Sequence, residues 1–160
     1  MTSVITRKMS ETYLGNSNIK RDGVTHNFTR EEVVEYSKCL KSPIYFSENY
    51  CKIIHLDKGL VPFKLYPYQK KMFKHFDKER FSIVLACRQS GKSISSVAYL
   101  LWYALFHPEK VIAILANKGA TAQEMLGRVT LMLENLPFFL QPGCKALNKR
   151  SIELSNNSRI

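Results

Sequence analysis

The feature that most constrains the fold is an order of apolar segments in the second half of the chain. The run FSIVLA (81–86) contains β-branched residues and predicts a strand that is buried on both faces. Residues 92–106 are apolar on nearly every side, which predicts a helix packed against a sheet. The run VIAILA (111–116) and a helical pattern over 120–136 repeat this order. Strand, helix, strand, helix is typical of right-handed crossovers, so the sequence predicts a parallel α/β sheet.

The loop after the first predicted strand carries a phosphate-binding pattern. Residues 86–93 read ACRQSGKS and match G-x-x-x-x-G-K-[ST], except that Ala86 replaces the first glycine. In such a loop successive backbone N–H groups point at phosphates, and the helix N-terminus adds a partial positive charge. Lys92 is expected to reach the β- and γ-phosphates of ATP, and the Ser93 hydroxyl to ligate Mg²⁺. The predicted nucleotide-binding residues of the loop are Ala86, Cys87, Arg88, Gln89, Ser90, Gly91, Lys92 and Ser93.

Three residues of the loop have a specific steric or electrostatic role. Ala86 is a mild replacement, because the smallest Cβ fits wherever φ is negative. Gly91 allows the backbone to come close where a Cβ would intrude. Arg88 and Lys92 are the candidate catalytic residues, since a guanidinium beside a transferred phosphate stabilises transition-state charge. A structural salt bridge is the other interpretation of Arg88.

The context of the loop decides between a nucleotide site and a chance Gly-Lys-Ser. A strand before the loop and a helix after it are what the motif requires, and both are predicted here. Gln69 lies on a further predicted helix, 66–78, whose apolar side includes Tyr68. Its amide offers a donor and an acceptor that suit the N6 and N7 edge of adenine, although a helical glutamine is more often exposed.

The first part of the chain predicts a small region that precedes the loop-bearing domain over residues 66–160. Residues 1–27 show weak periodicity and predict a mobile or loosely docked arm. Residues 28–65 predict a helical and hairpin subdomain. It contains a capped helix from Thr29, a second helix with Pro43 in its first turn, and two short strands around DKG. A further hairpin is expected at 144–147 and 151–154.

The charge balance favours a polyanionic partner. Lysine and arginine outnumber aspartate and glutamate by 24 to 13, a formal charge of +11, which is typical of proteins that bind nucleic acid or nucleotides. The other interpretation is that the charge only maintains solubility. The four cysteines form no C-x-x-C pair, and no apolar run reaches the roughly 18 residues of a membrane span. These features predict a soluble intracellular protein with reduced thiols.

Taken in order, several segments resemble the ATPase domain of large terminases, the DNA-packaging motors of tailed phages, of the phage T4 type. The R-Q-x-G-K-[ST] loop without its first glycine is itself typical of that family. The resemblance covers about residues 42–160 and rests on SPIYFSENYCKIIHLDKGL, LYPYQKKM, CRQSGKS, ILANKGATAQEMLGR, LPFFLQPG and NKRSIELSNNSRI. It implies an α/β P-loop NTPase core with a parallel sheet, of the helicase and terminase type, preceded by a small helical region.

The resemblance also implies a function and partners. The full-length family members couple ATP hydrolysis to packaging of double-stranded DNA into a prohead and carry an endonuclease domain. They act in the host cytoplasm as a ring docked on the portal protein, with a small terminase subunit. By the same resemblance Gln69 belongs to an adenine-recognising motif and Arg88 acts as an arginine finger. The segment 117–119 lies near DNA or couples to ATP, unless it is a plain turn, and Arg128 acts in trans or is surface charge, which we favour.

Two parts of the family pattern have no counterpart in the sequence. These are the Walker B strand with its catalytic glutamate, and the nuclease domain with its acidic cluster. We therefore expect a core that is incomplete at the C-terminus and that binds ATP but hydrolyses it poorly, because no evident base for the attacking water is present. A helicase or other P-loop translocase is the alternative function. A non-enzymatic nucleic-acid-binding module with an accidental loop is a third.

Overall fold

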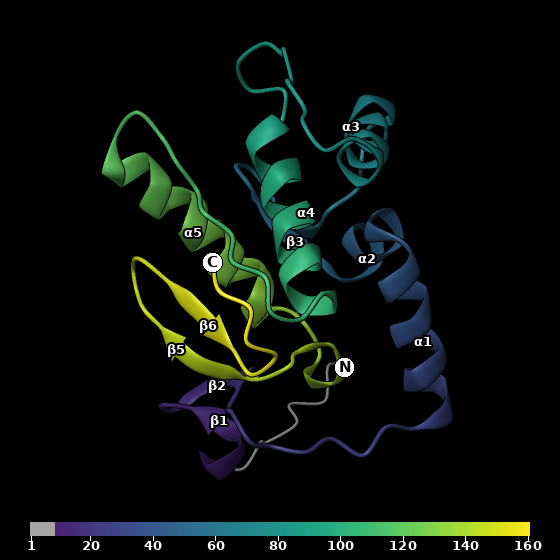
Figure 1. Cartoon of the computed structure of the whole chain (residues 1–160), viewed down its shortest axis with the longest axis vertical. Helices are drawn as coiled ribbons and strands as arrows, with labels where there is room; N and C mark the ends of the chain where they lie inside the picture. The colour runs from purple at the N-terminus through teal and green to yellow at the C-terminus, as the bar shows by residue number, and fades with distance from the viewer. Residues whose placement is uncertain (1–8) are drawn as a thin grey trace.

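The computed structural model describes residues 9–160 as a mixed α/β protein. These residues form five α-helices and three separate two-stranded antiparallel sheets (Figure 1). The helices are α1 (Arg30–Lys41), α2 (Pro43–Tyr50), α3 (Pro67–Lys78), α4 (Lys92–Phe106) and α5 (Gly119–Glu134). The strands are β1 (Thr12–Tyr13), β2 (Asn16–Lys20), β3 (Lys52–His55), β4 (Gly59–Pro62), β5 (Cys144–Leu147) and β6 (Ile152–Leu154). Two short 3-10 turns, η1 (Met9–Glu11) and η2 (Phe138–Leu140), complete the set.

The first two helices begin where the capping residues of the sequence predict. The Thr29 hydroxyl accepts a hydrogen bond from the Glu32 N–H at 3.2 Å, and the Glu32 carboxylate accepts from the Thr29 N–H at 2.9 Å. This reciprocal pair satisfies two N–H groups that a helix start leaves without partners. Ser42 ends α1 and caps α2, where its hydroxyl accepts from the Tyr45 N–H, and Pro43 occupies the first turn. Both predicted helices are confirmed.

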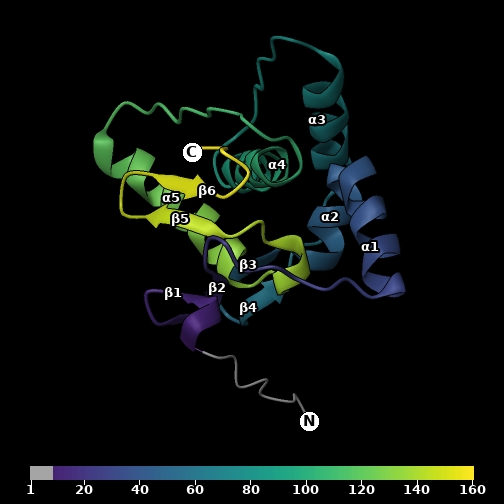
Figure 2. The same cartoon turned by 60° about the horizontal axis from the view of Figure 1, so that its bottom comes forward.

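Helix α4 is the centre of the core. It lies between α5 on one side and α2 and α3 on the other (Figures 1 and 2). The residues that it buries completely, or almost so, are Val97, Ala98, Leu101, Ala104 and Leu105. The Trp102 indole donates a hydrogen bond of 2.8 Å to the Cys39 carbonyl and so ties α4 to α1. A helix that is apolar nearly all round is stable only when neighbours cover it, and here three helices do so.

The N-terminal residues pack against the body of the protein through β2. Ile19 is 1% exposed, and the Lys20 N–H donates to the Gln141 side-chain oxygen at 2.8 Å. Of the two alternatives predicted for residues 1–27, a mobile or a loosely docked arm, the described part of the segment is docked. Ile19 and several long-range hydrogen bonds, among them those of Asn16 with Glu134 and of the Tyr13 hydroxyl with the Leu147 N–H, dock a hairpin whose own periodicity is weak. The first eight residues of that arm lie outside the described residues.

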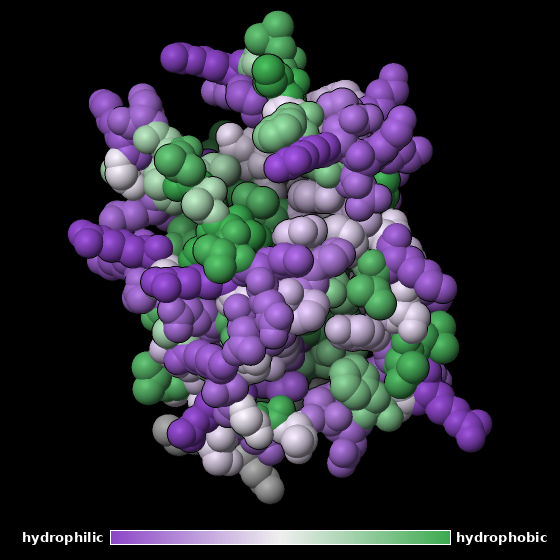
Figure 3. All heavy atoms as spheres, viewed as in Figure 1, coloured by the Kyte–Doolittle hydropathy of each residue, from purple (hydrophilic) through white to green (hydrophobic). Residues whose placement is uncertain are grey.

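Within residues 9–160 the two apolar runs predicted as parallel strands form no sheet with each other, so the described residues do not show the predicted parallel sheet. Within residues 9–160 neither run joins a ladder, apart from a single parallel bridge between Val111 and Arg159. Ile112 and Ile114 pack against the core, whereas Leu85 is 99% and Leu115 is 88% exposed. Figure 3 shows hydrophobic side chains on the face where 111–116 runs. A strand buried on both faces needs cover on both sides and a neighbour at each edge, and the described helices cover one side only.

The remaining predicted elements are confirmed with small changes of boundary. The β3–β4 and β5–β6 hairpins form at the expected positions, and β3 contacts α5. The four cysteines are free thiols, of which Cys87 is exposed. Burial is the main cause that raises the pKa of Cys39 to about 12. Within the part of the chain that the structure describes, no helix combines the length and the apolar character needed to cross a bilayer.

Candidate nucleotide-binding site

The predicted loop lies at the N-terminal end of α4, at the top of the molecule in Figure 1. Two residues turn the chain sharply there, since Gln89 has φ of 61° and Gly91 has φ of 75°. Gly91 is the N-cap of α4, so that Lys92 and Ser93 are the first two residues of the helix. The eight predicted residues, 86–93, are consecutive and lead through a turn at 88–91 into the helix. The free N–H groups of a helix start are at hand for an anion in this position.

Lys92 folds back over the loop from which it comes. Its ammonium lies 3.1 Å from the carbonyl oxygen of Cys87 and 3.4 Å from that of Ala86. The Ser90 hydroxyl donates to the same Cys87 carbonyl at 3.0 Å. These bonds hold a cation at the end of α4 that carries a partial positive charge. The loop therefore concentrates positive potential where an anion is the favourable partner.

Gly91 is required for two separate reasons. Its φ lies in the left-handed region, which a residue with a side chain adopts only with strain. A Cβ at this position would also lie 2.7 Å from the Gln69 amide nitrogen, closer than real contacts allow. The backbone at Gly91 therefore does come close to another group, as predicted, but that group is the Gln69 side chain of α3. Loop and helix are in direct contact here.

Gln69, the predicted adenine-recognising residue, is buried between α3 and the loop. Its side chain is 2% exposed, with its oxygen accepting from the Tyr66 N–H at 2.8 Å and its nitrogen donating to the Gly91 carbonyl at 3.4 Å. Both ends of the amide are thus bonded to main chain. We assign Gln69 to joining α3 to the loop. A glutamine three residues after the residue that caps a helix is the sequence signal for such a bond.

Tyr68 is a site residue that sequence reasoning placed in the core. It is 42% exposed, and its hydroxyl donates to the Ser90 carbonyl in the loop. Its ring stacks on that of Tyr66, with centroids 5.8 Å apart and planes within 9°. Tyr66 is 63% exposed. The two rings present an aromatic surface next to the loop. The only sequence signal for this surface was the position of both tyrosines at the start of α3.

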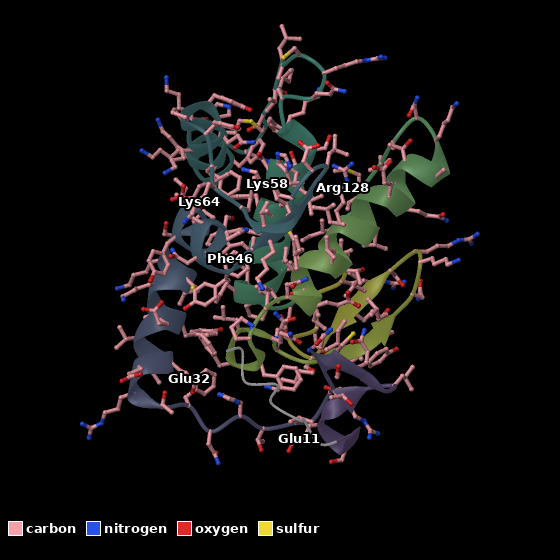
Figure 4. The ribbon with its side chains drawn as sticks, turned by 180° about the vertical axis from the view of Figure 1, so that it is seen from behind. Glu11, Glu32, Phe46, Lys58, Lys64 and Arg128 are labelled. Atoms are coloured by element: carbon pink, nitrogen blue, oxygen red, sulfur yellow. The ribbon has the colours of Figure 1, made fainter. Side chains whose placement is uncertain are left out.

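The other candidate residues differ in whether their side chains or main chain already have partners within residues 9–160. Arg88 is exposed and has no ion-pair partner within residues 9–160, so the salt bridge considered for it is not formed there. Lys118 is the N-cap of α5, with its carbonyl accepting from the first turn, as in a plain helix start. Arg128 forms an ion pair of 2.6 Å with Glu124 on the solvent-facing side of α5, as surface charges commonly do. Figure 4 shows Arg128 on α5.

Exposed lysines form a basic side on α3. Lys71 and Lys74 are exposed and lack ion pairs in the described chain, whereas Lys70 pairs with Glu48 at 2.9 Å. Lys58 and Lys64 add charge near the β3–β4 hairpin (Figure 4). Unpaired lysines on one helix are suited to contacts with phosphates that do not read sequence.

The chain matches no known family model. The described residues also contain no group of three or more histidine, cysteine, aspartate or glutamate side chains placed to hold a metal ion. The assignment of the loop therefore rests on its own geometry.

Proposed function

We propose that this chain binds Mg²⁺-ATP through residues 86–93, as the nucleotide-binding part of a DNA-packaging motor of the large-terminase type. The observation that carries the proposal is Lys92 at the first position of α4, with its ammonium turned back over the loop carbonyls. A lysine in this place meets a triphosphate together with the free N–H groups of the helix start. The exposure of Cys87, Arg88 and Gln89 supports access by a ligand.

Each residue has a distinct part in the proposed site. Lys92 exchanges neutral carbonyl partners for phosphate oxygens, because an ammonium attracts a negatively charged oxygen more strongly than a neutral carbonyl oxygen. Ser93, in the first turn of α4, provides the hydroxyl for Mg²⁺. Arg88, whose guanidinium has no ion-pair partner within residues 9–160, supplies positive charge beside the terminal phosphate. ATP contributes the phosphoanhydride whose cleavage would drive the motor.

The base is proposed to lie on the Tyr66–Tyr68 pair, in place of the Gln69 amide. The rings are exposed, stacked, and joined to the loop through the Tyr68 hydroxyl. Stacking of a base on an aromatic side chain contributes about 1–3 kcal/mol. Gln69 then acts indirectly, since it holds α3 and the loop together.

The wider proposal follows the resemblance. The motor would have a P-loop NTPase core with a parallel sheet, form a ring on the portal protein, and work with a small terminase subunit in the host cytoplasm. Its substrate would be double-stranded DNA, contacted through phosphates by lysines such as Lys71 and Lys74. The formal charge of +11 supports such contacts, whose strength depends on salt.

The nucleotide part is tested by calorimetric titration of the purified chain with Mg²⁺-ATP. We expect saturable binding that Lys92→Ala weakens at least tenfold, because the principal cation of the site is removed. Lys74→Ala removes an equal charge from α3 and is expected to leave binding unchanged. Absence of binding by the wild-type chain, with a helical circular dichroism spectrum, would overturn the nucleotide site.

The DNA part is tested separately by fluorescence anisotropy with a random-sequence duplex over a series of salt concentrations. Replacement of Lys71 and Lys74 by alanine is expected to reduce the salt slope by about 0.9 for each DNA phosphate that is no longer neutralised. Equal salt slopes for the wild-type chain and the double variant would show that Lys71 and Lys74 do not contact DNA. Preference for single-stranded over duplex DNA would favour the helicase alternative.

A further inference from the structure

A second candidate site lies at the opposite end of α4 from the loop. A cavity of about 420 Å³, open to solvent on one side, is lined by the segment before α1, by α1, by the C-terminal part of α4 and by η2 with the residues after it. Leu105, in its wall, is thirteen residues after Lys92, or about 20 Å along a helix. The apolar lining consists mainly of Phe28, Val33, Tyr36, Leu105, Phe139 and Pro142. The size lies within the range of small-molecule sites, about 300–1,000 Å³.

Lys20 contributes a cation to this apolar wall: its side chain is largely buried, while its ammonium still reaches solvent. It is the last residue of β2, lines the cavity, and is 7% exposed. Its ammonium has neither an ion pair nor a hydrogen bond within the described chain. Burial lowers its pKa, since loss of water disfavours the charged form. An anion placed beside this ammonium gains a charge-assisted hydrogen bond, which is stronger than one between neutral groups.

The other polar groups of the cavity are largely occupied. The Gln141 side-chain oxygen accepts from the Lys20 N–H at 2.8 Å, and its nitrogen donates to three main-chain carbonyls at 2.9–3.1 Å. The Ser37 hydroxyl donates to the Val33 carbonyl at 2.9 Å. This leaves the Lys20 ammonium and the Tyr36 hydroxyl as hydrogen-bond donors for a ligand. Donors without competing acceptors favour a ligand that carries negative oxygen atoms.

We propose that this cavity binds a small amphiphilic carboxylate, with its hydrocarbon part against the apolar lining and its carboxylate on the Lys20 ammonium. The apolar residues supply most of the contact area, and Lys20 selects an acid over a neutral molecule of the same shape. The site shares no residue with the loop at 86–93, so it stands independently of the proposed nucleotide site.

The test compares sodium octanoate with octan-1-ol, which has the same chain and no charge, by NMR titration of the full chain. We expect octanoate to bind at least tenfold more tightly than octanol. Lys20→Met keeps most of the aliphatic side chain and removes the charge, so we expect octanoate affinity to fall about tenfold and octanol affinity to stay. Lys41→Met, on the exposed end of α1, is the matched control and is expected to change neither.

Two results would overturn the proposal. One is equal affinity for octanoate and octanol, or no binding of either, by the wild-type chain. The other is octanoate affinity that Lys20→Met leaves unchanged. If Lys20→Met unfolds, Ser37→Trp gives the answer, because it places an indole from the exposed face of α1 at the edge of the cavity. Octanoate binding that survives this substitution contradicts the proposed position.

Discussion

The α1–α2 region and the two extended runs, 81–86 and 111–116, differ in how their apolar side chains are covered. In α1–α2 the helix ends are capped, and Phe46 on α2 is fully buried against Phe106 of α4, with ring centroids 5.5 Å apart. In 81–86 and 111–116 the backbone is extended without a ladder in the described chain, and alternate apolar side chains face solvent. Hydrophobicity alone therefore does not bury a segment. A neighbouring element must be present to cover it.

This difference arises from how far away along the chain each segment's backbone hydrogen-bond partner lies. A helix bonds its own backbone within four residues, and the β3–β4 hairpin finds its partner strand across a three-residue turn, Leu56 to Lys58. A parallel strand depends on a neighbour that the chain supplies only after a crossover. Within the described residues the run 111–116 has such a neighbour only at its start, where Val111 forms a parallel bridge with Arg159, and the run 81–86 has none. Local sequence signals are thus enough to form the helices and hairpins. A parallel sheet also needs strands that are distant in the chain.

The comparison is tested most strongly by one substitution in each region. Phe46→Ala is expected to lower the free energy of unfolding by about 3–5 kcal/mol, because it leaves a cavity in the core. Leu85→Ala is expected to change it by no more than about 0.5 kcal/mol, since Leu85 is already exposed to water. Urea denaturation measures both. A loss of about 2 kcal/mol or more for Leu85→Ala would show that the 81–86 run is packed in solution, and the contrast would fail.

The next largest effect separates strain from contact at two glycines. Gly91 and Gly59 both have positive φ, 75° and 67°, but a Cβ on Gly59 would meet nothing within 4 Å. Gly59→Ala is expected to lose about 1 kcal/mol, the lower end of left-handed strain for a residue with a Cβ. Gly91→Ala is expected to lose about 2 kcal/mol or more, because its Cβ also meets Gln69. Thermal unfolding of both variants measures the difference, and equal losses would mean that the Gln69 contact carries no strain.

The smallest effect is a pH dependence confined to the α1–α2 region. The hydrogen bond from Lys38, followed by those from Tyr45 and Tyr50, lowers the pKa of Glu35 from 4.5 to about 2. A depressed pKa stabilises the fold above the unfolded value, and this stabilisation is lost as pH falls from about 4.5 toward 2. Wild type is therefore expected to exceed Glu35→Gln in melting temperature at pH 7, with a gap that closes between pH 5 and pH 2.

Glu31→Gln is the control for this pH series, because Glu31 is exposed on the same helix. Its melting temperature relative to wild type is expected to change less over the same range. A Glu35→Gln gap that stays constant from pH 7 to pH 2 would contradict the role of the carboxylate. Neither extended run contains an acidic residue, so this pH sensitivity belongs to α1–α2 alone.

Sequence reasoning predicted most helices and hairpins, and it predicted where the loop meets α4. Its errors fall where side chains meet partners that are distant in the chain. Gln69 and Tyr68 lie about twenty residues before the loop that they contact, and nothing in their own helix shows which way they turn. Ile19 is buried by elements more than a hundred residues further on, which weak local periodicity does not reveal. The mixed α/β character was predicted, and the parallel sheet was not found in the described residues.

By itself the sequence determined the elements that close their hydrogen bonds locally. Thr29 and Ser42 set two helix starts, and Gly91 with Lys92 sets the start of α4 at the end of the loop. Only the tertiary structure decided which surfaces those elements leave open. The apolar cavity beside Lys20 and the solvent-facing side of 81–86 are examples. The physical reason is that burial depends on the sum of neighbours in space, whereas capping and turn formation depend on a few adjacent residues.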